Sequence, residues 1–191
     1  MKRISIFLAM VCSLGVATVG DVRPIDAQQS HLTVRVEKTG LLAAMAHNHN
    51  ISAPILRGRL DRSIRSSVSF EVNAAALRVT DTDISDSDRS EMQKRMLGPE
   101  VLDVTQYPVI HFVSDRVEST GPASWRVFGR LTLHGQTKPV VLEARLQNGH
   151  YRGTATISQS NFGVPPIKVA GGTIRVKDEV QIEYDIVLAG K

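Results

Sequence analysis

The chain has 191 residues, 42% of them hydrophobic, which is typical of one folded domain and too apolar for a disordered segment. The formal net charge is +4, and basic and acidic side chains are interspersed along the sequence. Nucleic-acid binding needs a clustered basic surface, so we expect no nucleic-acid partner.

Residues 1–20 have the features of a secretory signal peptide. Lys2 and Arg3 precede an uncharged apolar run, and the small residues Ala17 and Gly20 offer cleavage sites. The only cysteine, Cys12, lies inside this run, so the mature chain would contain no disulfide and no thiolate nucleophile.

We therefore predict a signal peptide over residues 1–20, one domain over residues 21–191, and a periplasmic or secreted location. The apolar run is short for a membrane span, although a retained N-terminal anchor is an alternative. No later segment is apolar enough to span a membrane, so we expect no stable span after the signal is removed.

The rest of the chain alternates apolar and polar residues with the period of two that marks strands with one buried face. Gly-containing turns at His134–Gly135 and Asn148–Gly149 separate alternating runs, as in β-hairpins. The last strand is expected to be interrupted at Lys177 and Asp178. The predicted strands span residues 31–38, 47–60, 68–79, 109–117, 124–133, 138–147, 150–158 and 173–188.

One short amphipathic helix is predicted over about residues 87–97. Asp88, followed three residues later by Glu91, resembles an N-cap, and Gly98 with Pro99 ends the helix. Eight antiparallel strands of near-even spacing favour closure, because closure removes exposed strand edges. The fold class is therefore all-β: an eight-stranded antiparallel lipocalin-like barrel with this one helix.

Three motifs occur in a specific order after the predicted helix. They are Leu-Asp-Val with Tyr-Pro and Ile-His-Phe at 102–112, Gly-Arg-Leu-Thr-Leu-His-Gly-Gln-Thr-Lys-Pro-Val at 129–140, and Asn-Phe-Gly at 161–163. In these motifs the chain resembles the YceI-like family, periplasmic lipocalin-like barrels that bind polyisoprenoid lipids. The resemblance implies an internal apolar tunnel and a secreted, non-enzymatic carrier of isoprenoid chains such as quinone tails. The chain departs from the family at residues 46–50, Ala-His-Asn-His-Asn, where better-known members have a histidine-glycine segment.

The apolar faces of the predicted strands supply candidate tunnel walls, since a polyisoprenoid needs only apolar walls and a polar mouth. The alternative is that these side chains pack against one another in a filled core, which periodicity alone does not distinguish. Small residues on the strands, such as Ala74 and Ala155, favour a cavity. The candidate wall residues are Leu32, Val34, Val36, Phe70, Val72, Phe112, Val127, Leu131, Leu133, Leu142 and Ile157.

His47 and His49 are the most informative polar residues, because residues two apart on an extended segment project to the same side. They could donate hydrogen bonds to a quinone carbonyl or lipid head group at the tunnel mouth. They could instead bind a metal, with His111 or His134 as a third ligand. The third interpretation is that both are solvated loop histidines.

The leading prediction is a binding protein, not an enzyme, that holds a long apolar lipid and needs no cofactor. The first alternative is a metal-binding or catalytic protein centred on His47 and His49. The second is a filled barrel that acts as a protein-interaction or stress-related module. The acidic segment between Asp81 and Asp88 lacks the glycine and glutamate spacing of a calcium loop, so we expect no calcium site there. A homodimer is possible.

Overall fold

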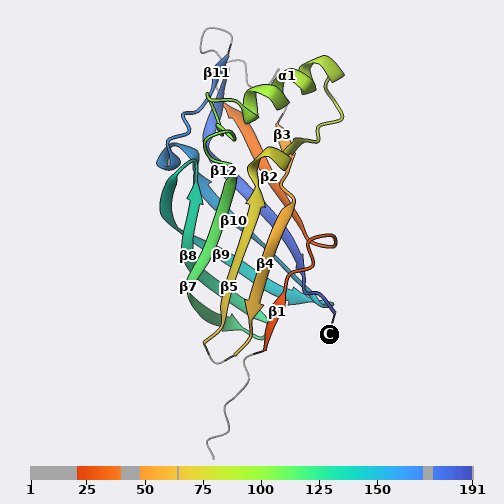
Figure 1. Cartoon of the computed structure of the whole chain (residues 1–191), viewed down its shortest axis with the longest axis vertical. Coiled ribbons are helices and arrows are strands. Elements are labelled where there is room, and N and C mark those ends of the chain that lie inside the picture. The colour runs from red at the N-terminus through yellow and green to blue at the C-terminus, as the bar shows by residue number, and fades with distance from the viewer. Residues whose placement is uncertain (1–20, 40–47, 64, 170–173, 191) are drawn as a thin grey trace, which may run out of the picture.

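The computed structural model describes residues 21–39, 48–63, 65–169 and 174–190, which form a curled antiparallel sheet with one α-helix (Figure 1). This confirms the predicted all-β lipocalin-like fold. The predicted signal peptide, the insert at 41–46 and His47 lie outside the described residues. The strands are β1 (Val22–Pro24), β2 (His31–Thr39), β3 (His49–Ser52), β4 (Ile55–Asp61), β5 (Ser67–Asn73), β6 (Arg78–Val79), β7 (Val109–Gly121), β8 (Ser124–Leu133), β9 (Gln136–Gln147), β10 (His150–Ser158), β11 (Lys168–Val169) and β12 (Ile174–Val187).

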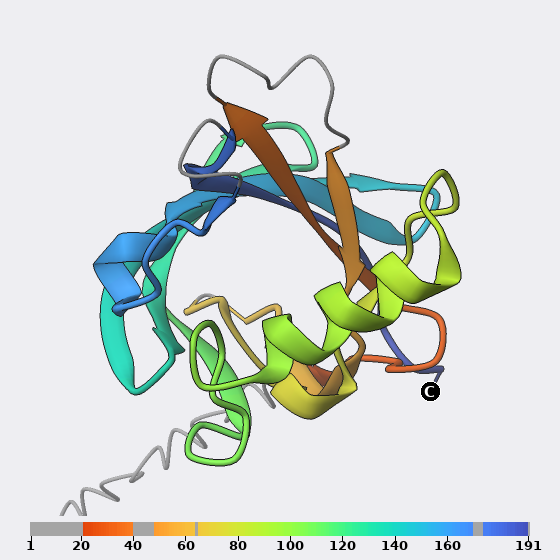
Figure 2. The ribbon, with the colours of Figure 1, turned by 90° about the horizontal axis from the view of Figure 1, so that it is seen from above.

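The strands follow one antiparallel path around the barrel, in the order β1-β4-β5-β7-β8-β9-β10-β12-β2-β3-β6. The path closes near β1, because Ile25 bridges Leu188 after β12 while its N–H donates to the carbonyl of Gly58 in β4. Seen from above, the strands enclose a ring, and the helix α1 (Asp86–Leu97) lies along its rim (Figure 2). The edge strands that a flat sheet would expose are thereby largely removed.

The strand count exceeds the predicted eight because two predicted strands are each divided and because two short strands, β1 and β11, were not predicted. Residues 47–60 split at Ala53–Pro54, so that β3 pairs with β2 and β6 while β4 pairs with β1 and β5. Residues 68–79 split at a 3₁₀ turn, η2 (Ala74–Ala76), where the side chain of Asn73 accepts a hydrogen bond from the N–H of Ala75. Each break moves the chain from one wall of the barrel to another.

The helix begins slightly before its predicted start, and its N-cap is Ser85 instead of Asp88. The hydroxyl oxygen of Ser85 accepts a hydrogen bond from the N–H of Asp88 at 3.1 Å. Asp88 is therefore the third helical residue, where its negative charge still suits the helix dipole. Gly98 caps the C-terminus as predicted.

Two tight turns set the register of strands β8 to β10. Both central residues of each turn have positive φ: 49° at His134 and 70° at Gly135, then 52° at Asn148 and 83° at Gly149. Two successive positive φ values describe a type I′ turn, whose twist matches that of the flanking strands. The predicted interruption in the last strand is also present, as a register shift between Val176 and Val180 of β12.

The side chain of Gln93 fastens α1 to the free edge of β6. Its Oε1 accepts a hydrogen bond from the N–H of Val79 at 2.9 Å, and its Nε2 donates to the carbonyl of Leu77 at 2.8 Å. The amide thus pairs with the strand as a neighbouring strand would. Met96 on the same helix is buried and extends this attachment with apolar contact.

We expect Gln93→Ala to lower the free energy of unfolding by about 1–3 kcal/mol, because two backbone groups at the β6 edge lose their partner. Chemical denaturation followed by circular dichroism measures this loss. Lys94→Ala, at an exposed position one residue along the same helix, is the matched control. A loss no larger than that of the control would show that water replaces the amide without cost.

Candidate functional site

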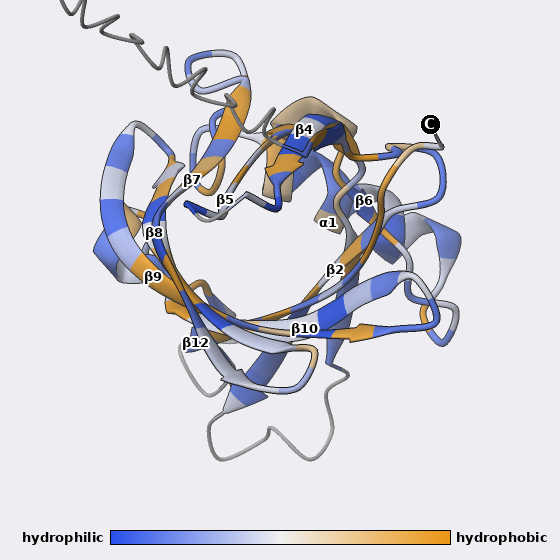
Figure 3. Cartoon of the chain, turned by 90° about the horizontal axis from the view of Figure 1, so that it is seen from below, coloured by the Kyte–Doolittle hydropathy of each residue, from blue (hydrophilic) through white to orange (hydrophobic). Residues whose placement is uncertain are grey.

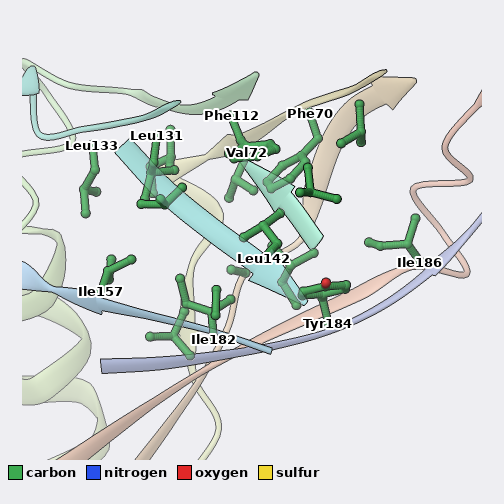
Figure 4. Close-up of a pocket in the computed structure, with 18 of the residues that line it drawn as sticks. Phe70, Val72, Phe112, Leu131, Leu133, Leu142, Ile157, Ile182, Tyr184 and Ile186 are labelled. Atoms are coloured by element: carbon green, nitrogen blue, oxygen red, sulfur yellow. The ribbon is translucent and has the colours of Figure 1, made fainter. Parts of the chain in front are cut away.

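The barrel encloses a cavity of about 410 Å³ whose lining is predominantly apolar (Figure 4). Alternation along the strands produces it, because every second residue of a strand points to the same face. Figure 3 shows hydrophobic and hydrophilic residues alternating along the strands. On β2, for example, Leu32, Val34 and Val36 line the cavity, and on β8 Val127 and Leu131 do so. The interior is therefore not filled by the protein's own side chains.

All eleven predicted wall residues lie on the lining of this cavity. That they contact a ligand stays a prediction, because alternation places these side chains on the lining but does not identify what the cavity holds. They are Leu32, Val34, Val36, Phe70, Val72, Phe112, Val127, Leu131, Leu133, Leu142 and Ile157.

A further part of the lining was not predicted from the sequence. On β12, Ile182, Tyr184 and Ile186 alternate as regularly as the predicted residues, so the signal was present in the sequence. Met96 of α1 and Leu102 after it also line the cavity. No strand-based pattern identifies these two residues, because they reach the cavity from the helical segment above the barrel.

The large aromatic side chains of the lining lie against glycines in the barrel wall. A Cβ atom at Gly129 would lie 2.6 Å from Cζ of Phe112, and one at Gly153 would lie 2.5 Å from the hydroxyl oxygen of Tyr184. The ring of Phe112 therefore lies in the space that a side chain at Gly129 would need. At Gly153 this space is taken by the hydroxyl of Tyr184 and by the carbonyl of Glu143. The bulk of Phe112 and Tyr184 is kept close to the wall, which leaves room in the lumen.

Two interactions fix these rings. Phe112 stacks on Phe70 with ring centroids 5.3 Å apart. The hydroxyl of Tyr184 donates a hydrogen bond of 2.5 Å to the carbonyl of Glu143 on β9. Burial raises the pKa of Tyr184 above its usual value, so the phenol is neutral and adds no charge to the apolar lining.

The polar residues that line the cavity gather mainly at its lower end, next to β1 in Figure 1. They are Asp61, Arg62, Ser66 and Ser67, on or beside the connection between β4 and β5. The guanidinium of Arg62 forms an ion pair with Asp21, which also accepts a backbone hydrogen bond at its carbonyl from Arg62. This end of the cavity therefore meets solvent through paired charges.

His49 lies at the opposite, upper end, and its partner is a carboxylate. Its Nδ1 lies 2.5 Å from Oδ2 of Asp81, whose side chain is only 1% exposed. Burial lowers the pKa of His49 below its ordinary value and the charge of Lys38 adds to this, while Asp81 acts in the opposite direction. Burial therefore favours the neutral imidazole.

The other predicted histidines do not join His49 among the described residues. His111 lies between Ile110 and Phe112, which both line the cavity, so its side chain faces the outside of the barrel. His134 packs on Tyr107, with ring centroids 4.6 Å apart. Within residues 21–39, 48–63, 65–169 and 174–190, no three histidine, cysteine or acidic side chains are grouped to hold a metal ion.

None of the helices among the described residues is long and apolar enough to cross a membrane.

Comparison with known proteins gives consistent matches of sequence and fold. A UPF0312 protein of Vibrio cholerae is 28% identical over 189 residues, covering 92% of this chain and 93% of that protein. A UPF0312 protein of Pseudomonas savastanoi pv. phaseolicola is 39% identical over 88 residues, covering 41% of this chain and 46%, about half, of that protein's length.

Two solved structures share the fold. BcnA of Burkholderia cenocepacia superposes with a TM-score of 0.64 at 21% identity, covering 87% of this chain and 99% of that chain. A polyisoprenoid binding domain from Saccharophagus degradans gives a TM-score of 0.56 at 14% identity, covering 88% of this chain and 98% of that chain. The sequence model of the YceI-like domain matches residues 24–188, and the chain therefore belongs to the YceI-like family.

Proposed function

We propose that this protein holds a long apolar isoprenoid-type lipid, a polyisoprenoid or a quinone, inside its barrel and carries or sequesters it. The observation that supports this most directly is the cavity of about 410 Å³ with its apolar lining. The solved relative from Saccharophagus degradans is itself described as a polyisoprenoid binding domain.

The energetics of such a complex come from burial. Each methylene group moved from water into an apolar interior contributes about 0.8 kcal/mol, so a chain of several isoprene units gains affinity from length alone. The wall needs few directional contacts for this. Phe70 and Phe112 present hydrocarbon surface to the lumen while their stacking keeps them in place.

The proposed setting is the periplasm or the outside of the cell. The supporting observation is the leader, with Lys2 and Arg3 before an uncharged apolar run. A carrier is useful there because an isoprenoid chain is insoluble in the water between membranes. Enclosure in the barrel shields its apolar surface, which is the requirement for transfer or sequestration.

Native mass spectrometry of the gently purified protein tests the proposal against its alternatives. A co-purifying species of several hundred daltons, exchangeable for an added quinone, is the expected result. A mass that corresponds to the bare chain, with no uptake of added quinone or polyprenol, would contradict it. Bound metal that is lost in His49→Ala would support the metal-binding alternative instead.

A charge inside the cavity should abolish lipid uptake. Leu131 is only 7% exposed and lines the cavity, so the carboxylate in Leu131→Glu would be left unpaired in an apolar surrounding. Val141→Glu is the matched control, because Val141 is 42% exposed on the neighbouring strand β9. Quinone uptake by the two folded variants, followed by fluorescence quenching of the single Trp125, measures the difference. Equal uptake would place the lipid elsewhere.

Filling the lumen without charge should shorten the chain that the protein accepts. Ala155 lines the cavity, whereas its neighbour Thr154 is exposed. We expect Ala155→Trp to weaken binding of a C40 polyprenol at least about tenfold, equivalent to about 1.4 kcal/mol, and that of a C15 alcohol less. Thr154→Trp should leave both affinities unchanged. An Ala155→Trp variant that binds the long chain normally would rule out the lumen as the binding site.

A further inference from the structure

The upper rim of the cavity carries a polar row directly above an apolar one. In the apolar row, Val34 on β2 is paired with Ile51 on β3, and Ile51 with Val79 on β6. Two residues further toward the rim, on the same face, Val36 is paired with His49. When the register between β3 and β6 is extended by two residues, Asp81 lies opposite His49. Val34, Val36 and Ile51 line the cavity, so alternation and pairing place His49 and Asp81 on the same face of the sheet, just beyond the lining.

Asp81 is held rigidly in this row. Its Oδ1 accepts a hydrogen bond of 2.7 Å from the backbone N–H of Asn50, and Oδ2 lies 2.5 Å from Nδ1 of His49. Its backbone carbonyl accepts a hydrogen bond from the guanidinium of Arg89 on α1 at 2.8 Å. The carboxylate is therefore oriented by Asn50 and His49 of β3, while α1 holds the backbone of the same residue.

This geometry determines which nitrogen of His49 carries the proton. A carboxylate oxygen only accepts hydrogen bonds, so Nδ1 must be the donor to Asp81. In a neutral imidazole the other nitrogen, Nε2, is then an acceptor. Asp81 and Asp83 raise the pKa of the ring, whereas burial, the largest effect, and the charge of Lys38 lower it and favour the neutral form.

We propose that Nε2 of His49 is a hydrogen-bond acceptor that receives a hydroxyl group at the head of the bound lipid. The proposal rests on the proposed function, because it assigns the polar end of the lipid to the upper rim of the same cavity. A polyprenol or a reduced, hydroxyl-bearing quinone can donate to Nε2. An oxidised quinone presents only carbonyl oxygens, which Nε2 cannot satisfy. The structure thus reverses the donor role that the sequence suggested for this histidine.

Asp81 is the positioning residue in this arrangement, and Asp81→Asn should reverse the polarity of His49. The oxygen of the amide can still accept from the N–H of Asn50, which turns its NH₂ group toward Nδ1 of His49. Nδ1 must then accept, so the proton moves to Nε2, which becomes a donor. The variant changes the shape of the site by little and its hydrogen-bonding character completely.

Binding of two matched lipids tests the proposal. Geranylgeraniol has a hydroxyl donor, and its methyl ether keeps the same chain and the oxygen but lacks the donor. We expect the wild-type protein to bind the alcohol about fivefold more tightly, the contribution of one neutral hydrogen bond. In Asp81→Asn this preference should disappear, because a donor at Nε2 serves both oxygens. Glu91→Gln, at an exposed position on α1 away from the cavity lining, is the control and should keep the wild-type preference. Arg62→Gln tests the lower end of the cavity.

The protonation of the ring gives a second readout that does not depend on a ligand. Long-range ¹⁵N–¹H spectra of the full chain, with His49 assigned by its loss in His49→Gln, should show the proton on Nδ1 in the wild type and on Nε2 in Asp81→Asn. A wild-type ring protonated on Nε2 overturns the proposal, even if the variant does not fold.

Failure of the head-group assignment can be distinguished from failure of the lipid-binding function. Equal wild-type affinity for the alcohol and the ether overturns the assignment of the head group and leaves the lipid-binding function standing. Binding of neither compound overturns both. A preference for the alcohol that is lost in Arg62→Gln but kept in Asp81→Asn would place the head group at the lower end.

Discussion

The structure depends on keeping a closed sheet apolar inside without letting its side chains fill the lumen. Large rings give the lining its hydrophobic surface, yet rings that projected inward would occupy the space that a ligand needs. Gly129 and Gly153 resolve this conflict, because the absence of a Cβ lets the ring of Phe112 and the hydroxyl of Tyr184 lie against the wall. A cavity results where ordinary packing would leave a filled core.

The same constraint explains the hydrogen bond of Tyr184. A buried phenol costs free energy unless its hydroxyl finds a partner, and a partner across the lumen would draw the ring inward. The carbonyl of Glu143 is a partner within the wall itself, and it is reachable only because Gly153 lies between. The same hydrogen bond therefore satisfies the hydroxyl of Tyr184 and keeps its ring out of the cavity.

Much of this was predictable from the sequence. Alternation along a strand decides which residues share a face, so all eleven predicted wall residues, from Leu32 to Ile157, lie on the cavity lining. Alternation does not decide whether the enclosed space is filled, because this depends on how Phe112 meets Gly129 from a neighbouring strand. The sequence shows both residues and gives no register between them.

The parts that were not predicted have a common physical origin. Strands 47–60 and 68–79 divide because Pro54 and the turn at Asn73 redirect the chain, which period-two alternation does not reveal. The pairing of His49 with Asp81 joins residues 32 positions apart and exists only through the register of β3 with β6. Sequence spacing places His47 on the same side as His49, but a local pattern carries no information on a cross-strand neighbour such as Asp81.

Burying the carboxylate of Asp81 beside His49 costs desolvation free energy, and apolar side chains could pack at this rim without that cost. Leucine and valine at the positions of His49 and Asp81 would continue the apolar row of Ile51 and Val79 and cost no desolvation. The backbone N–H of Asn50 instead holds the carboxylate in place, and Arg89 holds the backbone carbonyl of the same residue. The fold thus maintains a fixed hydrogen-bonding direction at the point where the apolar lining ends. A fixed acceptor at this point is useful to a lipid whose chain ends there in a hydroxyl group that donates a hydrogen bond.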